Sequence, residues 1–198
     1  MISTSGSQLL PEAAVKELRT RLLPITTVVT PNIPEARLLL KDAGTDPLEP
    51  EDLPSLIQLA KQISTLGPKA VLLKGGHLAL TRGHKIARDQ REASLVVDVL
   101  YDGEDVTLFE TDYLVSKNTH GTGCSLASAI AANLALGKTL KRAIRGAVRF
   151  VEAGIKTSTD LGKGSGPINH FHSFYSLPFA PYVDSSFSVI RYDNLLTG

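Results

Sequence analysis

Short β-rich runs alternate with longer helix-forming segments along most of this sequence, and polar or glycine-rich loops follow the runs. The run "ITTVVT" stops at Pro31, and "KAVLLKGG" ends in a double glycine. This alternation predicts an α/β fold, in which helices cover a mostly parallel sheet. Functional side chains are expected in the loops after the strands, because ligands of such sheets bind beyond the carboxyl ends of the strands.

Three segments show the helical period most clearly. Residues 10–22 carry apolar side chains every three to four positions, with Pro11 tolerated in the first turn. A second helix is predicted after the proline-punctuated stretch 46–54 and ends near Gly67. The third predicted helix has an apolar face with basic residues elsewhere, and this face comprises Leu140, Ile144, Ala147, Val148 and Val151.

Other segments depart from the alternation. Residues 94–110 contain two β-rich runs around Asp102-Gly103, which predicts a hairpin. Residues 77–93 are hydrophilic with little periodicity and are interpreted as a surface excursion. Residues 173–198 are rich in aromatic residues, proline and serine without periodicity, so an irregular tail or linker is expected after a domain spanning residues 1–172.

Composition narrows the class of protein. The chain has 198 residues, a net charge of +1 and a single cysteine. The charge shows no bias toward nucleic acid or anionic membranes, and one thiol cannot form an internal disulfide, so a cytoplasmic protein is expected. The N-terminus has no basic and apolar leader, and the weakly polar run 125–136 is shorter than the roughly 18 residues of a membrane span.

The single cysteine, Cys124, lies in "SKNTHGTGCSLASAIAANLALG", residues 116–137. Gly121 and Gly123 let the backbone turn so that successive N–H groups point into one hollow, and a small-residue helix is predicted from Ser125 onward. Such a helix start can hold a phosphate and favours a thiolate, which could accept a proton from a substrate hydroxyl. The alternative is a small apolar side chain buried where a helix meets a sheet. Position alone leaves both interpretations open.

Two further stretches point to phosphate chemistry. Lys74 follows a predicted strand and precedes Gly75-Gly76, so its ammonium can lie at the carboxyl edge of the sheet. Asn32 and Glu35 in "PNIPE" follow another strand, at a spacing that suits a hydrated Mg²⁺. Each signal alone is weak, since a lysine at a strand end is usually solvated and Asn-x-x-Glu is a common helix cap. Together they indicate phosphoryl transfer.

In this order, "TPNIPEA", "VLLKGGH" and "SKNTHGTGCSLASAIAANLA" resemble the C-terminal half of the hydroxymethylpyrimidine/phosphomethylpyrimidine kinases of thiamine biosynthesis, members of the ribokinase-like superfamily. The resemblance covers about residues 1–172, including "MISTSG" and "GPINHFH". It implies a partial ribokinase-like fold of three α/β/α layers, with a mostly parallel sheet and the N-terminal strands missing. It also implies transfer of the ATP γ-phosphate to the pyrimidine's hydroxymethyl group and then to the resulting monophosphate.

The resemblance assigns roles to individual residues. Cys124 would be the catalytic base, at a place where sugar-kinase relatives carry an aspartate. Gly121, Thr122 and Gly123 would form the anion hole, and Lys74 would contact the transferring phosphates.

The resemblance also assigns residues to the metal and the nucleotide. Asn32 and Glu35 would correspond to the magnesium and phosphate motif. The segment that leads into the nucleotide site would consist of Lys117, Asn118, Thr119 and His120.

The implied ligands are ATP with Mg²⁺ and a small pyrimidine alcohol or its phosphate, in a homodimer that binds neither nucleic acid nor membrane. Family members carry a further glycine-rich N-terminal segment that supplies much of the pyrimidine pocket, and nothing here matches it. Two alternatives therefore accompany the main hypothesis. One is a pyridoxal kinase-like enzyme of the same fold, and the other is a nucleotide-binding fragment without catalysis.

Three other motifs are rejected. Gly137-Lys138-Thr139 resembles the end of a Walker A loop, but position 132 is Ala, and the motif is predicted to end one helix and begin the next. His170 and His172 are predicted to be surface residues rather than metal ligands, because no Cys or carboxylate cluster lies nearby in the sequence. A cysteine hydrolase using Cys124 with His120 or His77 would need an orienting Asn or Asp and a different loop.

Overall fold

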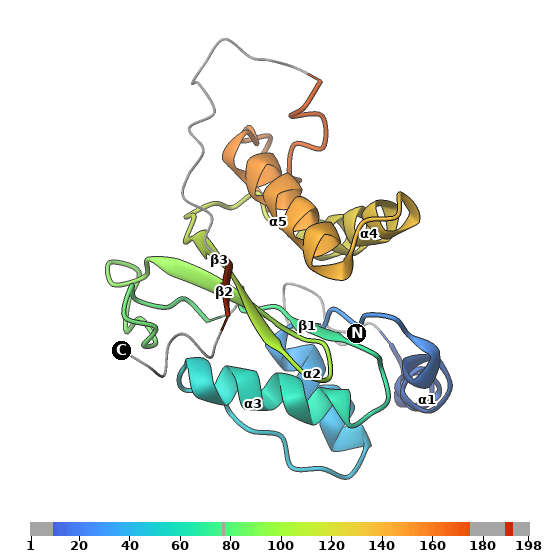
Figure 1. Ribbon diagram of the computed structural model, residues 1–198. Helices are drawn as coiled ribbons and strands as arrows, with labels where there is room; N and C mark the ends of the chain where they lie inside the picture. The colour runs from blue at the N-terminus through green and yellow to red at the C-terminus, as the bar shows by residue number, and fades with distance from the viewer. Residues whose placement is uncertain (1–9, 77, 175–188, 192–198) are drawn as a thin grey trace. The chain divides into compact units, whose positions relative to one another are not determined.

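The computed structural model describes residues 10–76, 78–174 and 189–191 (Figure 1). The described residues fall into two compact units. Unit 1 comprises residues 10–113 with 189–191, and unit 2 comprises residues 114–174.

The predicted first helix of unit 1 is present but irregular. Helix α1 spans Glu12–Glu17 with Pro11 as its N-cap, and it continues as a π-helical turn η1, Leu18–Leu22, and a 3₁₀ turn η2, Leu23–Ile25. An ion pair of 2.6 Å between Arg19 Nε and Asp42 Oδ2 ties this segment to the end of the following helix.

Helices α2, Ile33–Asp42, and α3, Leu53–Ser64, have the same kind of N-terminal cap. Each has a reciprocal capping box, in which the N-cap side chain and the side chain three residues later bond each other's backbone N–H. The N-caps are Asn32 for α2 and Asp52 for α3. Helix α3 packs against the sheet and α2 packs against α3 (Figure 1).

In the described part of the chain the sheet has four strands in the order β1-β2-β3-β4, and all neighbours are antiparallel. Strands β2, Leu95–Tyr101, and β3, Val106–Asp112, form the hairpin predicted at Asp102-Gly103, where Gly103 has a φ of 96°. Strand β1, Val71–Leu73, pairs with β2 on its other side. The hairpin prediction is confirmed.

The α/β class is confirmed, but the mostly parallel sheet is not confirmed among the described strands. Within the described residues, parallel pairing occurs only as isolated bridges, which are Val29–Val71 and Asn32–Lys74 in unit 1 and His120–Pro167 in unit 2. The predicted strand at residues 25–30 does not form a regular strand. It contacts β1 only through isolated hydrogen bonds, such as the one from Leu72 N–H to Val29 O at 2.9 Å. Pro31 has no N–H to donate, which interrupts the ladder, and the tight β2–β3 turn enforces antiparallel pairing.

Unit 1 buries one apolar core between its helices and one face of the sheet. The alternation of the strands supplies the sheet side, since Val97, Val99 and Leu108 point into this core. Side chains from α2 and α3 complete it, among them Leu39, Leu59, Ala60 and Ile63.

Unit 2 contains two helices packed side by side, α4, Thr122–Ala135, and α5, Leu140–Lys156 (Figure 1). Three of the residues predicted on the apolar face of α5 are buried, namely Ile144, Ala147 and Val148. Gly137 takes a φ of 76° between the helices and Thr139 is the N-cap of α5. The motif Gly137-Lys138-Thr139 therefore ends one helix and begins the next, as predicted.

Most of residues 173–198, predicted to be an irregular tail or linker, lie outside the described residues. Within that range, Val189–Arg191 forms strand β4, which pairs with β3 so that Phe109 lies opposite Val189. Three residues are too short a run for a periodic signal. None of the helices described in the structure combines the length and the apolar character that a membrane-spanning helix requires.

Candidate active site

Three of the predicted site residues come together in unit 1, where the chain leaves β1. Lys74 follows β1 directly, and its backbone N–H donates to Pro31 O at 2.9 Å, which places it beside Asn32. Lys74 Nζ lies 4.0 Å from Glu35 Oε2, and the side chains are 20% and 11% exposed. The structure thus gathers a cation, a carboxylate and an amide at one edge of the sheet.

Asn32 and Glu35 are also the capping box of α2. Asn32 Oδ1 accepts from Glu35 N–H at 2.8 Å, and Glu35 Oε2 accepts from Asn32 N–H at 2.9 Å. One carboxylate and one amide oxygen are too few for an all-protein metal cage, but they suit a hydrated Mg²⁺ that takes its other oxygens from water and phosphate. Among the described residues, no cluster of three or more His, Cys, Asp or Glu side chains is arranged to hold a metal.

Asp98 on β2 is a member of this region that the sequence analysis missed. Its Oδ1 accepts a hydrogen bond of 2.9 Å from the backbone N–H of Gly75. Burial raises the pKa of Asp98 to about 6, while the Gly75 hydrogen bond and the charge of Lys74 oppose the rise. The sequence signal was available, because Asp98 is a carboxylate in the middle of an apolar strand.

The cysteine loop in unit 2 turns at Gly121 as predicted, but α4 begins at Thr122 rather than at Ser125, so Gly123 lies within the helix and not in the turn. Gly121 takes a left-handed φ of 84° and is the N-cap of α4, and its carbonyl accepts from Ser125 N–H at 2.9 Å. The N–H groups of the first helical turn have no intrahelical acceptor, and they carry the positive end of the helix dipole. Cys124, in this turn, is exposed, so the alternative of a buried apolar cysteine is wrong.

The segment before Gly121 is held by residues that follow α5. Asn118 is 2% exposed, and its Nδ2 donates to Asp160 Oδ1 at 2.8 Å. Lys117 Nζ lies 3.4 Å from Asp160 Oδ2 and bonds Gly162 O at 3.3 Å. The hydrogen bond from Asn118, followed by the contacts with Lys117, holds the pKa of Asp160 below its usual range. Lys117 and Asn118 are therefore ordered by partners within unit 2.

The other two residues of this segment make backbone and side-chain contacts of their own. His120 N–H donates to Gly166 O at 3.1 Å. Thr119 O accepts from the hydroxyl of Thr122 at 3.1 Å. These bonds shape the turn that leads into Gly121.

His170 and His172 also lie against unit 2 helices. His170 Nε2 is 2.7 Å from Ser125 Oγ, so it contacts the residue after Cys124. The His172 ring lies tilted by 52° against the Phe150 ring, with the ring centroids 4.8 Å apart. Neither histidine belongs to a metal-binding cluster among the described residues. His77, the other histidine considered with Cys124, lies outside the described residues.

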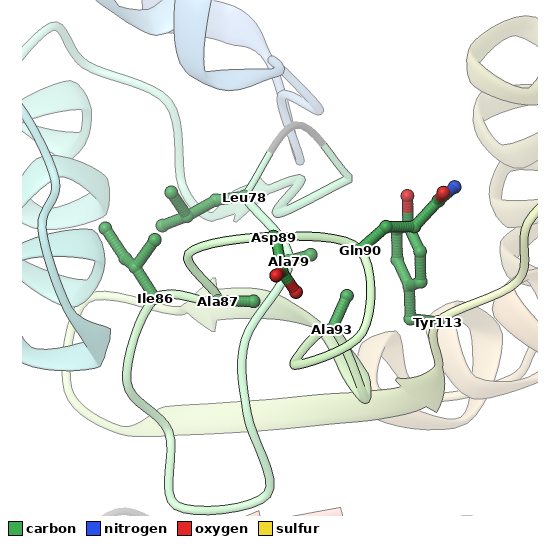
Figure 2. A pocket seen from close by; sticks show the side chains of 8 residues that line it. All are labelled: Leu78, Ala79, Ile86, Ala87, Asp89, Gln90, Ala93 and Tyr113. Atoms are coloured by element: carbon green, nitrogen blue, oxygen red, sulfur yellow. The ribbon is translucent and has the colours of Figure 1, made fainter.

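A hollow of about 310 Å³ lies in the excursion after β1, and none of the residues that line it is one predicted for the site. Figure 2 shows Leu78 and Ile86 on one side of it and Gln90 beside Tyr113 on the other. The excursion is held by bridges from Leu80 to Ile86 and to Leu95. The segment predicted as a surface excursion thus has a fixed course and an apolar lining.

Comparisons with known proteins agree on one family. The sequence model of the phosphomethylpyrimidine kinase family matches residues 1–169. A thiamine biosynthesis bifunctional protein of Geobacter sulfurreducens is 42% identical over 170 residues, which cover 86% of this chain and 31% of that protein. A hydroxymethylpyrimidine/phosphomethylpyrimidine kinase of Synechococcus elongatus is 39% identical, with 88% and 60% covered. The chain thus spans less than two thirds of the length of these relatives.

Solved structures show the same fold. A pyridoxal kinase of Staphylococcus aureus in complex with AMP-PCP matches with a TM-score of 0.71 and 26% identity, covering 96% of this chain and 61% of that one. An ADP complex of Bacillus subtilis pyridoxal kinase matches with a TM-score of 0.68 and 34% identity, covering 84% and 58%. The ribokinase-like α/β fold expected from the sequence is therefore confirmed, apart from the mostly parallel sheet.

Proposed function

Because the chain belongs to the phosphomethylpyrimidine kinase family, we propose that it acts in the ATP-dependent phosphorylation of hydroxymethylpyrimidine and its monophosphate, a step of thiamine biosynthesis. The observation that carries the proposal is the exposed thiol of Cys124 in the first turn of α4, directly after the left-handed Gly121. An exposed thiol at a helix N-terminus has the surroundings of a reactive cysteine.

In the proposed reaction Cys124 is the general base. Its thiolate accepts the proton of the substrate hydroxyl while the substrate oxygen forms a bond to the γ-phosphorus of ATP. The bond from that phosphorus to the bridging oxygen breaks, and ADP leaves with the electron pair. The backbone N–H groups of Gly121, Thr122 and Gly123 bind the charge on the transferring group.

The residues at the end of β1 bind phosphate and metal in this proposal. Lys74 contacts the transferring phosphates as a point charge. Glu35 and Asn32 hold a hydrated Mg²⁺, which neutralises phosphate charge when it is bound. The supporting observation is the gathering of these three side chains, with Lys74 Nζ 4.0 Å from the Glu35 carboxylate.

The segment 117–120 leads to the nucleotide in this proposal. Its supporting observation is that Lys117 and Asn118 are already ordered by Asp160, so nucleotide binding does not have to order them.

The single cysteine and the nature of the substrates support a cytoplasmic location, and a homodimer remains a prediction from the family.

Pyridoxal phosphorylation is the second candidate, because solved neighbours of this chain are pyridoxal kinases with TM-scores of 0.71 and 0.68. The family match favours the pyrimidine over pyridoxal. The third candidate is not an enzyme function: it is a fragment that binds nucleotide without catalysing phosphate transfer.

A coupled phosphorylation assay with ATP and Mg²⁺ tests the proposal, with hydroxymethylpyrimidine and pyridoxal as competing acceptors. Cys124→Ser should lower pyrimidine turnover by about 10²–10⁴-fold, because a hydroxyl is a far weaker base than a thiolate. Binding of AMP-PCP, measured by calorimetry, should stay unchanged. Ser128→Ala, at an exposed position of the same helix, is the matched control and should retain turnover.

Each outcome separates the candidates. Equal turnover of Cys124→Ser and the wild type would contradict the role as base. Faster turnover of pyridoxal would favour the second candidate. Nucleotide binding without turnover of either acceptor would identify the non-catalytic fragment.

A further inference from the structure

Asp98 lies where β1 stops pairing with its neighbour. Leu73 pairs with Val99, and the next residues of the chain turn across β2. Gly75 lies so close to β2 that a Cβ on it would overlap the carbonyl oxygen of Val97. The turn therefore needs glycine at this position, and it brings the Gly75 backbone against Asp98.

The carboxylate of Asp98 takes the place of a backbone carbonyl of the sheet as the hydrogen-bond acceptor for the N–H of Gly75. Gly75 is buried, and its N–H donates to Asp98 Oδ1 at 2.9 Å. A buried backbone N–H needs an acceptor, and a charged acceptor makes the stronger bond. Asp98 thus fixes the backbone immediately after Lys74.

Lys74 is held from two sides by this arrangement. Its own N–H bonds Pro31 O at 2.9 Å, while the residue after it is bonded to Asp98. Its ammonium lies 4.0 Å from the Glu35 carboxylate, and its charge acts on the Asp98 carboxyl through space. A cation whose backbone and charge are both fixed is preorganised for a phosphate.

We propose that Asp98 is a positioning residue, whose carboxylate fixes the turn at Lys74-Gly75 and holds the Lys74 ammonium where it meets the transferring phosphates. The role of Lys74 in this inference rests on the proposed function. A purely structural Asp98 would satisfy the Gly75 N–H and leave the Lys74 ammonium unaffected.

Nuclear magnetic resonance of the unliganded chain tests the positioning directly. In Asp98→Ala, the Gly75 amide should exchange with solvent about tenfold faster or more, because it loses its acceptor. The side-chain resonance of Lys74 should shift as well, because a neighbouring charge is gone. Asp98→Asn keeps an acceptor oxygen, so it should shift Lys74 while leaving Gly75 protected. Asp112→Asn, an exposed carboxyl at the end of β3, is the matched control and should change neither.

A double-mutant cycle connects the turn to phosphate binding. Asp98→Ala should weaken MgATP binding about tenfold in the wild-type background and have no further effect in Lys74→Met, because the carboxylate acts through the ammonium. Equal losses in both backgrounds would overturn the proposal.

The other outcomes are equally decisive. Unchanged Gly75 exchange in a folded Asp98→Ala protein would overturn the proposal, and so would faster exchange with an unshifted Lys74 resonance. If Asp98→Ala does not fold, an unshifted Lys74 resonance in Asp98→Asn overturns it. If both resonance effects appear but the wild type does not bind MgATP, the positioning of Lys74 stands and the proposed function fails.

Discussion

At the scale of single residues, the site depends on where side chains are absent as much as on where they are present. Gly75 has no space for a Cβ because of the Val97 carbonyl, whereas Gly121 has open space but a left-handed φ of 84°. The first glycine allows two backbone segments to approach each other, and the second allows the chain to turn into α4. Each therefore places a charged or reactive neighbour, Lys74 or Cys124.

Asp98 should make stability depend on pH. Its pKa in the folded protein is about 6, against an ordinary value of 3.8, so the folded chain binds this proton more tightly than the unfolded chain does. The contribution of Asp98 to the free energy of unfolding is complete below the ordinary value and is lost as the pH rises through about 6. The wild type should therefore lose stability relative to Asp98→Asn between about pH 4 and about pH 7, by at most about 1.4 kcal/mol per pH unit.

Urea unfolding of both proteins across this pH range measures the difference. The Asp112→Asn profile controls for removal of a surface carboxyl from the same sheet. A constant difference between the wild type and Asp98→Asn would contradict the raised pKa.

At the scale of elements, α2 combines a structural cap with the proposed metal ligands. The cap of α2 uses the amide of Asn32 and the carboxylate of Glu35, and α3 has the same kind of cap without a proposed function. The start of a helix and a phosphate or metal site therefore use the same two side chains. The two roles can be separated because the cap needs an acceptor oxygen, whereas the metal needs a charge.

Asn32→Ala should lower the free energy of unfolding by about 1 kcal/mol, because it removes the N-cap acceptor. Glu35→Gln keeps an oxygen for the Asn32 N–H and should change stability by less than about 0.5 kcal/mol. It should nevertheless raise the Mg²⁺ concentration needed for half-maximal turnover, since the charged ligand is lost. Urea unfolding and a Mg²⁺ titration of the kinase assay measure the two effects, with Asp52→Ala as the capping control in α3. An unchanged Mg²⁺ requirement would contradict the metal role of Glu35.

The elements also show how far local patterns predict structure. The hairpin at Asp102-Gly103 and the apolar face of α5 were predicted because turn residues and helical spacing act over a few positions. The strand at 25–30 was predicted from its β-branched composition, but only bridges to β1 formed. A high β-propensity indicates only that the side chains suit the surface of a sheet. Pro31 has no backbone N–H to donate to the neighbouring strand, so the hydrogen-bonded ladder is interrupted there.

At the scale of the whole molecule, the two units have cores of different size. The large apolar cluster belongs entirely to unit 1, and the described part of unit 2 buries fewer apolar side chains, among them Leu126, Ile130 and Ile144. Stability grows with the apolar area that a unit buries. Unit 2, which carries Cys124, is therefore expected to be the less stable of the two.

Tryptophan reporters test this difference, because the chain has no tryptophan of its own. Tyr101→Trp reports on unit 1 and Phe150→Trp on unit 2, each at a half-buried aromatic position. In urea, the Phe150→Trp signal should change at a lower midpoint than the Tyr101→Trp signal. The far-ultraviolet circular dichroism of each variant controls for effects of the substitution itself. A higher midpoint for unit 2 would contradict the comparison of the cores.

The sequence by itself determined the α/β class, the family, the helix faces and the turns, including the turn at Gly121 before Cys124. It also indicated Asn32, Glu35 and Lys74, which the structure places next to one another and whose roles stay predictions. These features depend on residues a few positions apart or on a motif that is continuous in the chain. Only the tertiary structure decided the antiparallel pairing of β1 and β4 with the hairpin, the exposure of Cys124 and the contacts of Asp98 with Gly75 and of Asn118 with Asp160. Those partners are 23 and 42 residues apart, so their meeting depends on how whole strands and helices pack, which no local pattern encodes.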